Sequence, residues 1–247
     1  MARARLFPDV RRVARLLAAE YKLSRLGNKS APLDELAYVL LSGRTSEGKY
    51  QAVYAAFKRR FPRWQDVADA TLAQIATAIS LGGLARQKAR YLRAIARKVR
   101  RDFGRVSLRG LQEYSTARAE EYLCSLPGVG IKTARCVLMY ALGRPVFPAD
   151  IHCLRVLARL GWIDCRAATS REVADSVQRG DRVSAYVADT AQAGIPPALR
   201  HPLHVYFVQH GRAVCRPRPR CDECVLRQLC PRVGVAETEP VPRGALE

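Results

Sequence analysis

Acidic residues are scarce in this chain of 247 residues, where 22 Asp and Glu are present against 42 Lys and Arg and the net charge is +20. Lysine is scarce as well, since the chain has seven lysines and 35 arginines. Arginine presents a rigid fork of donors that suits phosphate, so this excess predicts an anionic polymer or surface as the partner, with nucleic acid as the first candidate. The alternative is a biased genomic base composition, which also enriches alanine and arginine.

Long apolar runs are absent too. No run approaches the roughly 20 apolar residues that a membrane-spanning helix needs, so we expect no membrane partner. Residues 1–17 are rich in arginine, but they contain no apolar signal core. Asp9 and Glu20, together with the helical pattern of this segment, argue against a transit peptide.

A disulfide scaffold is not expected, because the chain is long and its periodicity is that of ordinary helices. The eight cysteines fall into a scattered group and a clustered group. The scattered group is Cys124, Cys136, Cys153 and Cys165, and the clustered group is Cys215, Cys221, Cys224 and Cys230. This usage indicates a reducing compartment and one metal site.

No strand pattern persists and no internal repeat is present, so the predicted fold class is all-α. Asp9 is expected to cap the first helix, which carries Val10, Val13 and Leu17 on its apolar face. Further helices are predicted over 32–41, 50–61, 64–79, 86–103, 117–125 and 151–160, with a helix that carries Lys132 in its first turn and runs to residue 142, a helix pair in 166–200 and a disordered tail over 233–247.

One predicted helix carries a row of arginines. The row has spacings of four and three, so its members share one face; they are Arg86, Arg90, Arg93, Arg97 and Arg100. Two interpretations stay open, a solvated helix face and a surface that steers phosphate.

A glycine-bracketed turn, LPGVG, joins two of the predicted helices. Gly128 and Gly130 allow a tight turn and bring backbone N–H groups close to an anion, at the start of a helix whose dipole favours negative charge. Leu126 and Val129 are its hydrophobic anchors. This pattern is typical of a helix-hairpin-helix, a module that binds a DNA phosphate without reading bases.

Lys132 follows this turn in a helix that is otherwise almost entirely apolar. Burial and the positive end of the helix both favour a neutral amine, which is the form that attacks to make a Schiff base. The alternative is a lysine that extends to solvent or contacts phosphate. Asp150 is expected to cap the next helix, and its carboxylate can also stabilise positive charge at a deoxyribose. His152 is expected to be structural.

The clustered cysteines have the spacing Cys215-x5-Cys221-x2-Cys224-x5-Cys230, with no neighbouring histidine. Four thiolates in one short loop suit a [4Fe–4S] cluster. They suit zinc less well, since zinc sites usually pair two separated knuckles.

The string LPGVGIKTA, followed eighteen residues after its lysine by the aspartate of ADIH, resembles the endonuclease III family of helix-hairpin-helix DNA glycosylase/AP lyases. The resemblance implies a lysine nucleophile at Lys132, an essential aspartate at Asp150 and a [4Fe–4S] cluster on the four cysteines. In the monofunctional adenine-mismatch relatives another residue occupies the lysine position, so lysine here favours the bifunctional enzyme.

The resemblance also implies DNA contacts. VLLSGRTSE resembles the loop that fills the space left by a damaged base, although this chain has Arg44 where the family has glutamine. Gly83-Leu84 resembles the turn that wedges an apolar side chain into the opposite strand. Arg216 and Arg218 lie in a cluster loop one residue shorter than is usual, and they resemble a second phosphate contact.

The implied architecture has two all-α domains with a cleft between them. A six-helix barrel domain would cover 34–144 and contain the helix-hairpin-helix at about 117–142. An iron–sulfur cluster domain would combine 1–33 with 145–232. Lys132 and Asp150 would then face each other from opposite sides of the cleft.

Together these features predict a base-excision repair DNA glycosylase with AP lyase activity that removes oxidised pyrimidines and cleaves the strand by β-elimination. Its partner would be double-stranded DNA with damaged bases or abasic sites. We expect a monomeric, cytoplasmic, nucleoid-associated bacterial protein. Two alternatives stay open: a DNA-binding protein of this fold with weak or lost catalysis, and a glycosylase for ultraviolet photoproducts.

Overall fold

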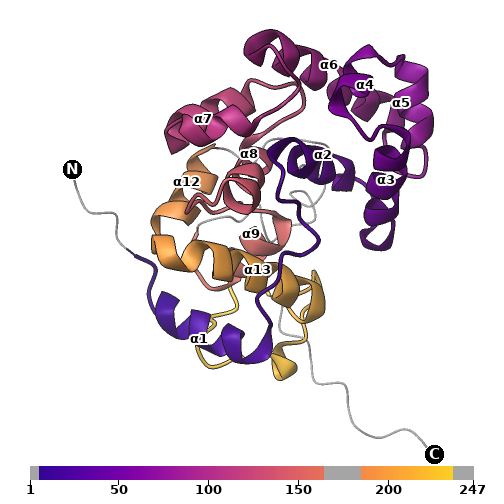
Figure 1. Ribbon diagram of the computed structural model, residues 1–247. Helices are drawn as coiled ribbons and strands as arrows, with labels where there is room; N and C mark the ends of the chain where they lie inside the picture. The colour runs from indigo at the N-terminus through magenta and orange to yellow at the C-terminus, as the bar shows by residue number, and fades with distance from the viewer. Residues whose placement is uncertain (1–5, 164–184, 236–247) are drawn as a thin grey trace, which may run out of the picture.

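The computed structural model describes residues 6–163 and 185–235, and every regular element in these two ranges is a helix, which confirms the all-α fold class. No helix in these ranges is long and apolar enough to cross a membrane. In chain order (Figure 1) the elements are α1 (Val10–Glu20), α2 (Pro32–Ser42), α3 (Glu47–Arg60), α4 (Trp64–Asp69), α5 (Leu72–Ala78), α6 (Ala85–Phe103), η1 (Arg109–Glu113), α7 (Thr116–Cys124), α8 (Ile131–Cys136), η2 (Val137–Ala141), α9 (Ile151–Arg159), α12 (Ala185–Ala193), α13 (Pro197–Ala213) and η3 (Cys221–Glu223).

The first hydrophobic core lies between residues 33 and 146 and gathers the apolar faces of α2 to η2. α2 is buried around most of its circumference, which explains the continuous apolar run in its sequence. α6 shows the opposite pattern, since Leu92, Ile95 and Val99 form one buried stripe and arginines occupy most of the remaining surface. This stripe packs against α4 and α5.

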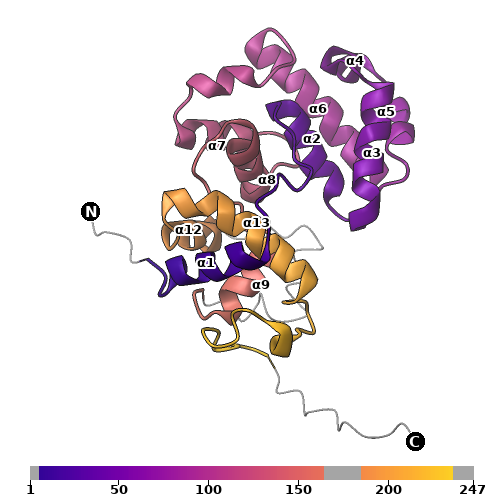
Figure 2. The same cartoon turned by 60° about the horizontal axis from the view of Figure 1, so that its bottom comes forward.

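The second core contains both ends of the described chain, since it joins residues of α1 to residues 147–226. α1 lies beside α13 in both views (Figures 1 and 2). At the centre of this core the fully buried rings of Phe147 and Phe207 meet edge to face with centroids 6.4 Å apart. The predicted domain limits, 34–144 for one domain and 1–33 with 145–232 for the other, stay a prediction.

Three local predictions are wrong. The helix predicted over 64–79 is two helices, because Thr71 begins a new one: its hydroxyl accepts the N–H of Gln74 while the Gln74 side chain accepts the N–H of Thr71. Asp9 has a left-handed φ of 52°, and its side chain does not cap α1. The helix that carries Lys132 is α-helical only to residue 136 and continues as the π-helical turn η2.

The beginning of the predicted tail is ordered, since the N–H of Val233 donates to the carbonyl of Arg159 at 3.2 Å. Residues 236–247 lie outside the described residues. The same is true of 164–184, which include Cys165 and most of the predicted helix pair; the described remainder of that stretch forms α12 and the beginning of α13.

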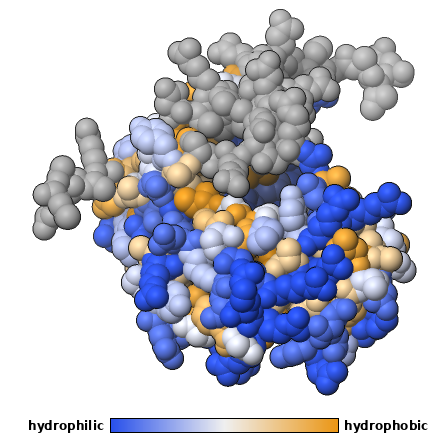
Figure 3. Space-filling view, turned by 90° about the horizontal axis from the view of Figure 1, so that it is seen from above, coloured by the Kyte–Doolittle hydropathy of each residue, from blue (hydrophilic) through white to orange (hydrophobic). Residues whose placement is uncertain are grey.

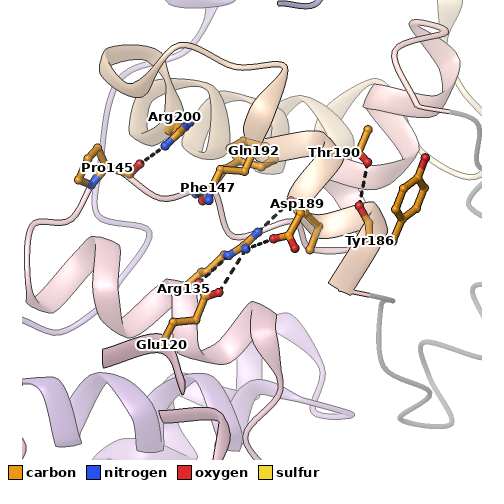
Figure 4. A network of polar contacts seen from close by, with 10 residues as sticks. Glu120, Arg135, Pro145, Phe147, Tyr186, Asp189, Thr190, Gln192 and Arg200 are labelled. Atoms are coloured by element: carbon orange, nitrogen blue, oxygen red, sulfur yellow. Dashed lines mark hydrogen bonds and ion pairs between the residues drawn. The ribbon is translucent and has the colours of Figure 1, made fainter. Parts of the chain in front are cut away.

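Arg135 on α8 connects the two cores (Figure 4). Its side chain is 2% exposed, and it donates to Glu120 of α7 at 2.8 Å, to the carbonyl of Ala188 of α12 at 2.8 Å, and to Asp189. A buried cation with its donors satisfied from both sides holds α8 at a fixed position relative to α12. Arg135 thus makes this connection from a helix whose other residues, apart from Lys132, are uncharged.

Candidate active site

The turn between α7 and α8 has the geometry predicted for a hairpin. Gly128 has a φ of 76°, and a Cβ there would approach the ring of Tyr91 to 2.5 Å, so only glycine fits without rearrangement. The N–H of Val129 donates to the carbonyl of Leu126 at 3.1 Å, which closes the turn. Gly130 precedes the first residue of α8. Phosphate binding by this turn stays a prediction.

Val129 is a hydrophobic anchor of the turn, as predicted. Its side chain is 3% exposed and packs in the first core with Leu126, which is 2% exposed. Any contact that Val129 makes with DNA is therefore through its backbone, and its side chain anchors the turn.

Lys132 is half-buried in the first turn of α8. Burial lowers its pKa, but the side chains of Cys136, Asp150 and Glu35 raise it, and the net shift is upward. The expectation of a neutral resting amine is therefore wrong, because the neighbouring acidic groups outweigh the burial that favours the neutral form. At rest, Lys132 is an ammonium.

Asp150 caps α9, as predicted, since its Oδ1 accepts the N–H of Cys153 at 2.9 Å. Burial raises the pKa of this carboxyl, but its neighbours His152, His204 and Lys132 and the N–H of Cys153 lower it, and the net shift is strongly downward. Asp150 and Lys132 are thus close enough to change each other's pKa. The structure brings the two predicted catalytic residues together.

Two histidines lie near Asp150, and one of them, His204, supports the segment that leads into it. Burial lowers the pKa of His204 to about 4, so its ring is neutral and Nδ1 donates to the carbonyl of Pro148 at 2.8 Å. His152 accepts from Arg155 at 3.1 Å, in agreement with a structural role. His204 was not singled out from the sequence, because its partner is a backbone carbonyl from a distant loop.

The loops that carry Arg44 and Leu84 are adjacent. Gly83 lies directly against the carbonyl of Arg44, so closely that a Cβ there would collide with it. Arg44 is exposed with a left-handed φ of 51°, and Leu84 is 47% exposed with a φ of 60°. The predicted filler and the predicted wedge therefore project from neighbouring turns; their contacts with DNA stay predictions.

Lys88 connects these two loops, and the sequence analysis missed it. It is 5% exposed, and its Nζ donates to the carbonyls of Leu41 and Gly43 at 2.9 and 2.5 Å and to the hydroxyl of Thr45 at 3.0 Å. A buried ammonium with three acceptors fixes the loop that holds Arg44 to the first turns of α6.

The four clustered cysteines line one cavity together with Leu226 and His210. His210 Nε2 lies 3.5 Å from Cys224 Sγ, and its Nδ1 lies 3.0 Å from the hydroxyl of Tyr21 on α1. In the described part of the chain, no three His, Cys, Asp or Glu side chains converge closely enough to hold a single metal ion. The four thiols thus surround one shared space.

Arg159 holds the cysteine loop in place and is a second residue that the sequence analysis missed. It is 5% exposed, and its guanidinium donates to the sulfur of Cys215 at 3.2 Å and to the carbonyls of Arg216 and Pro217 at 2.7 and 2.9 Å. Arg216 and Arg218 are exposed on this loop, and their phosphate contact stays a prediction.

The arginine row of α6 divides into two parts. Arg97 donates to the carbonyl of Ala68 at 2.8 Å, and Arg100 pairs with Asp69 at 2.7 Å, so these two stabilise the packing of α4 on α6. The remaining members lie at or near the surface. Hydrophilic side chains predominate on the face that Figure 3 presents. Phosphate steering stays a prediction for Arg86, Arg90 and Arg93.

This fold and site define a class. Residues 37–179 match the HhH-GPD superfamily of base excision DNA repair proteins. The chain belongs to this superfamily, in its endonuclease III-like group of helix-hairpin-helix glycosylases.

Similar proteins of known sequence or structure carry the names endonuclease III or DNA glycosylase. Endonuclease III of Thermotoga maritima is 27% identical over 210 residues, which are 85% of this chain and 87% of that protein. The solved structure of a non-covalent Endonuclease III–DNA complex superimposes with a TM-score of 0.72 at 25% identity, and covers 91% of this chain and 94% of that one. An Arabidopsis thaliana protein named "Putative DNA glycosylase At3g47830" is 32% identical over 210 residues, or 85% of this chain. The chain spans 64% of that plant protein's length.

Proposed function

We propose that this protein is a bifunctional DNA glycosylase and AP lyase that removes oxidised pyrimidines and cleaves the strand by β-elimination. The observation that carries the proposal is the proximity of Lys132 to Asp150. α8 supplies an amine, the N-cap of α9 supplies a carboxylate, and each changes the pKa of the other. The similarity to an endonuclease III seen in complex with DNA supports DNA as the substrate.

In this mechanism Nζ of Lys132 attacks C1′ of the damaged nucleotide. The Nζ–C1′ bond forms as the N-glycosidic bond breaks, and the base leaves with the electron pair and takes up a proton. The Asp150 carboxylate stabilises the positive charge that develops at C1′. Loss of a proton from Nζ and opening of the sugar ring give an imine, and removal of a C2′ proton then expels the 3′ phosphate. Hydrolysis of the imine returns the free amine.

Access to the sugar requires that the nucleotide leaves the stack. We infer that Leu84 wedges into the duplex while Arg44 stacks in the space left behind. The contact between Gly83 and the Arg44 carbonyl supports this pairing, since one movement of the protein would insert both side chains. The three hydrogen bonds of Lys88 would keep that pair rigid.

We further infer that Cys215, Cys221, Cys224 and Cys230 hold a [4Fe–4S] cluster. Their shared cavity supports this, as does the placement of four thiols in one short loop. When bound, the cluster would cross-link the two ends of this loop.

Analysis of the pure protein for iron and acid-labile sulfide tests the cluster. We expect about four of each per chain, with loss of both in Cys221→Ser. Cys124→Ser, a change outside the loop, should retain them. A parent protein without iron would contradict the inference.

Borohydride reduction on a duplex with one abasic site tests the nucleophile. The parent should form a covalent adduct, and Lys132→Ala should form none above background, because the imine needs this amine. Lys22→Ala removes an exposed lysine and should trap like the parent. A parent that binds the duplex without trapping or nicking would instead favour a DNA-binding protein with weak or lost catalysis.

A further inference from the structure

The charge of Lys132 creates a chemical requirement. An amine whose pKa is at or above about 10.4 is neutral in fewer than about one molecule in a thousand at pH 7. Lys132 has its pKa raised above the ordinary value by its neighbours. It therefore needs a nearby group that accepts its proton before it attacks a sugar. Asp150 is a poor acceptor, because the same surroundings lower its own pKa and Cys153 already donates to it.

A second carboxyl group lies near enough to Lys132 for the two to change each other's pKa, although no direct hydrogen bond or ion pair joins these two described residues. Glu35 is on α2, which packs directly against α8, and its side chain is 0% exposed. Oε2 accepts the backbone N–H of Lys29 at 2.6 Å. Oε1 is buried and has no hydrogen-bond partner among the described residues. Such an oxygen is unusual, since buried carboxylates generally have all their oxygens hydrogen-bonded.

Burial raises the pKa of Glu35 to about 7, against the N–H of Lys29 and the charges of Lys132, Arg25 and Lys29, which lower it. Glu35 thus exchanges its proton near neutral pH, unlike Asp150. The titratable and charged groups that act on Glu35 or respond to it come from every element packed around it: Arg25 and Lys29 in the segment before α2, Tyr38 on α2, Tyr54 on α3, Lys132 and Cys136 on α8, and Tyr140 on η2.

We propose that Glu35 accepts the proton of Lys132 and so makes its amine nucleophilic, an inference that rests on the proposed lyase chemistry. In this step one N–H bond of the ammonium breaks, its electron pair stays on Nζ, and an O–H bond forms on Glu35. Two opposite charges become two neutral groups, so the step leaves no new buried charge without a partner. Glu35 touches no substrate and acts through Lys132, so it is a positioning residue.

A purely structural Glu35 would behave differently. Its bond to the N–H of Lys29 orders the segment before α2, and glutamine can form the same bond. If the charge of Glu35 did nothing more than raise the pKa of Lys132, then Glu35→Gln would free the amine and speed the reaction at pH 7. If Glu35 instead accepts the proton of Lys132, then Glu35→Gln should slow the reaction at pH 7.

The experiment measures single-turnover trapping on abasic duplex from pH 5.5 to pH 10 for the parent, Glu35→Gln and Glu35→Asp. The parent rate should rise with pH and level off above about pH 7. Glu35→Gln should be slower at pH 7 by at least about tenfold, without that inflection, and should approach the parent near pH 10, where hydroxide removes the proton. Glu35→Asp should restore the inflection with a lower plateau.

Asp34→Asn is the matched control. This neighbouring carboxylate accepts from Trp64 at 3.0 Å and pairs with Lys58, away from Lys132, so its loss should leave the pH profile unchanged. Binding to a duplex with a tetrahydrofuran abasic analogue should be equal for all variants and shows that each is folded. Trapping by Glu35→Gln with the parent's profile, or faster at pH 7, would overturn the inference. A parent that does not trap would instead overturn the proposed function.

Discussion

Asp150 and Glu35 both act on Lys132, yet their surroundings move the two carboxyl groups in opposite directions. Asp150 lies at a helix N-terminus, accepts the N–H of Cys153 at 2.9 Å, and has its pKa lowered. Glu35 lies inside α2 with one oxygen unpartnered among the described residues, and burial raises its pKa to about 7. The neighbours His152, His204 and Lys132, together with a hydrogen bond from the helix end, keep the Asp150 carboxylate charged, while desolvation lets Glu35 exchange a proton.

Asp150→Asn tests the charged carboxyl group of the two, and it is expected to have the largest effect on the rate of excision. The change removes the charge and keeps an oxygen that can cap α9. We expect single-turnover excision to fall by about 10² to 10⁴-fold, since stabilisation of charge at C1′ is lost. Thermal unfolding should stay close to that of the parent.

Asp150→Ala provides the control, because it also removes the cap and should lower the free energy of unfolding by about 1 kcal/mol. Excision by Asp150→Asn within tenfold of the parent would mean that the carboxylate serves the helix alone.

A smaller effect is expected on the pH dependence of the protein's stability when Glu35 is changed to glutamine. The pKa of this carboxyl is raised in the folded protein, from 4.5 to about 7. Its favourable contribution is therefore complete below pH 4.5 and is lost as the pH rises through 7. Glutamine has no carboxyl group to ionise, so Glu35→Gln does not lose this stability as the pH rises. The stability of the variant relative to the parent should rise by about 2 kcal/mol between pH 5 and pH 8.

Urea denaturation of both proteins at the two pH values measures this difference. Asp34→Asn should show no comparable gain, because Asp34 keeps partners in Lys58 and Trp64. A difference between Glu35→Gln and the parent that is the same at both pH values would contradict the assignment of a raised pKa.

The hairpin and the α9 cap could be predicted because each depends on residues close together in the chain. Gly128 provides the left-handed residue of the turn, and Asp150 caps α9, the helix that begins at the next residue. Neither feature depends on contacts with distant parts of the chain. The capping box at Thr71 and Gln74 was also present in the sequence as a local signal, and it was missed because the apolar periodicity continues across it.

The charge state of Lys132 could not be predicted in the same way. It depends on Glu35, which lies on a helix far away in the sequence and reaches the site only through the packing of α2 on α8. The same holds for Arg159, whose partners in the cysteine loop come from beyond α13. Long-range contacts between buried polar groups leave no periodic pattern in a sequence, so only the folded structure reveals them.

The most direct test of the central claim is the site of the covalent bond to DNA. After borohydride trapping on an abasic duplex, digestion with trypsin and mass spectrometry would locate the modified residue. We predict an adduct on Lys132, in a peptide spanning 119–135 because trypsin does not cleave after a modified lysine. An adduct on any other amine of the chain would contradict the account.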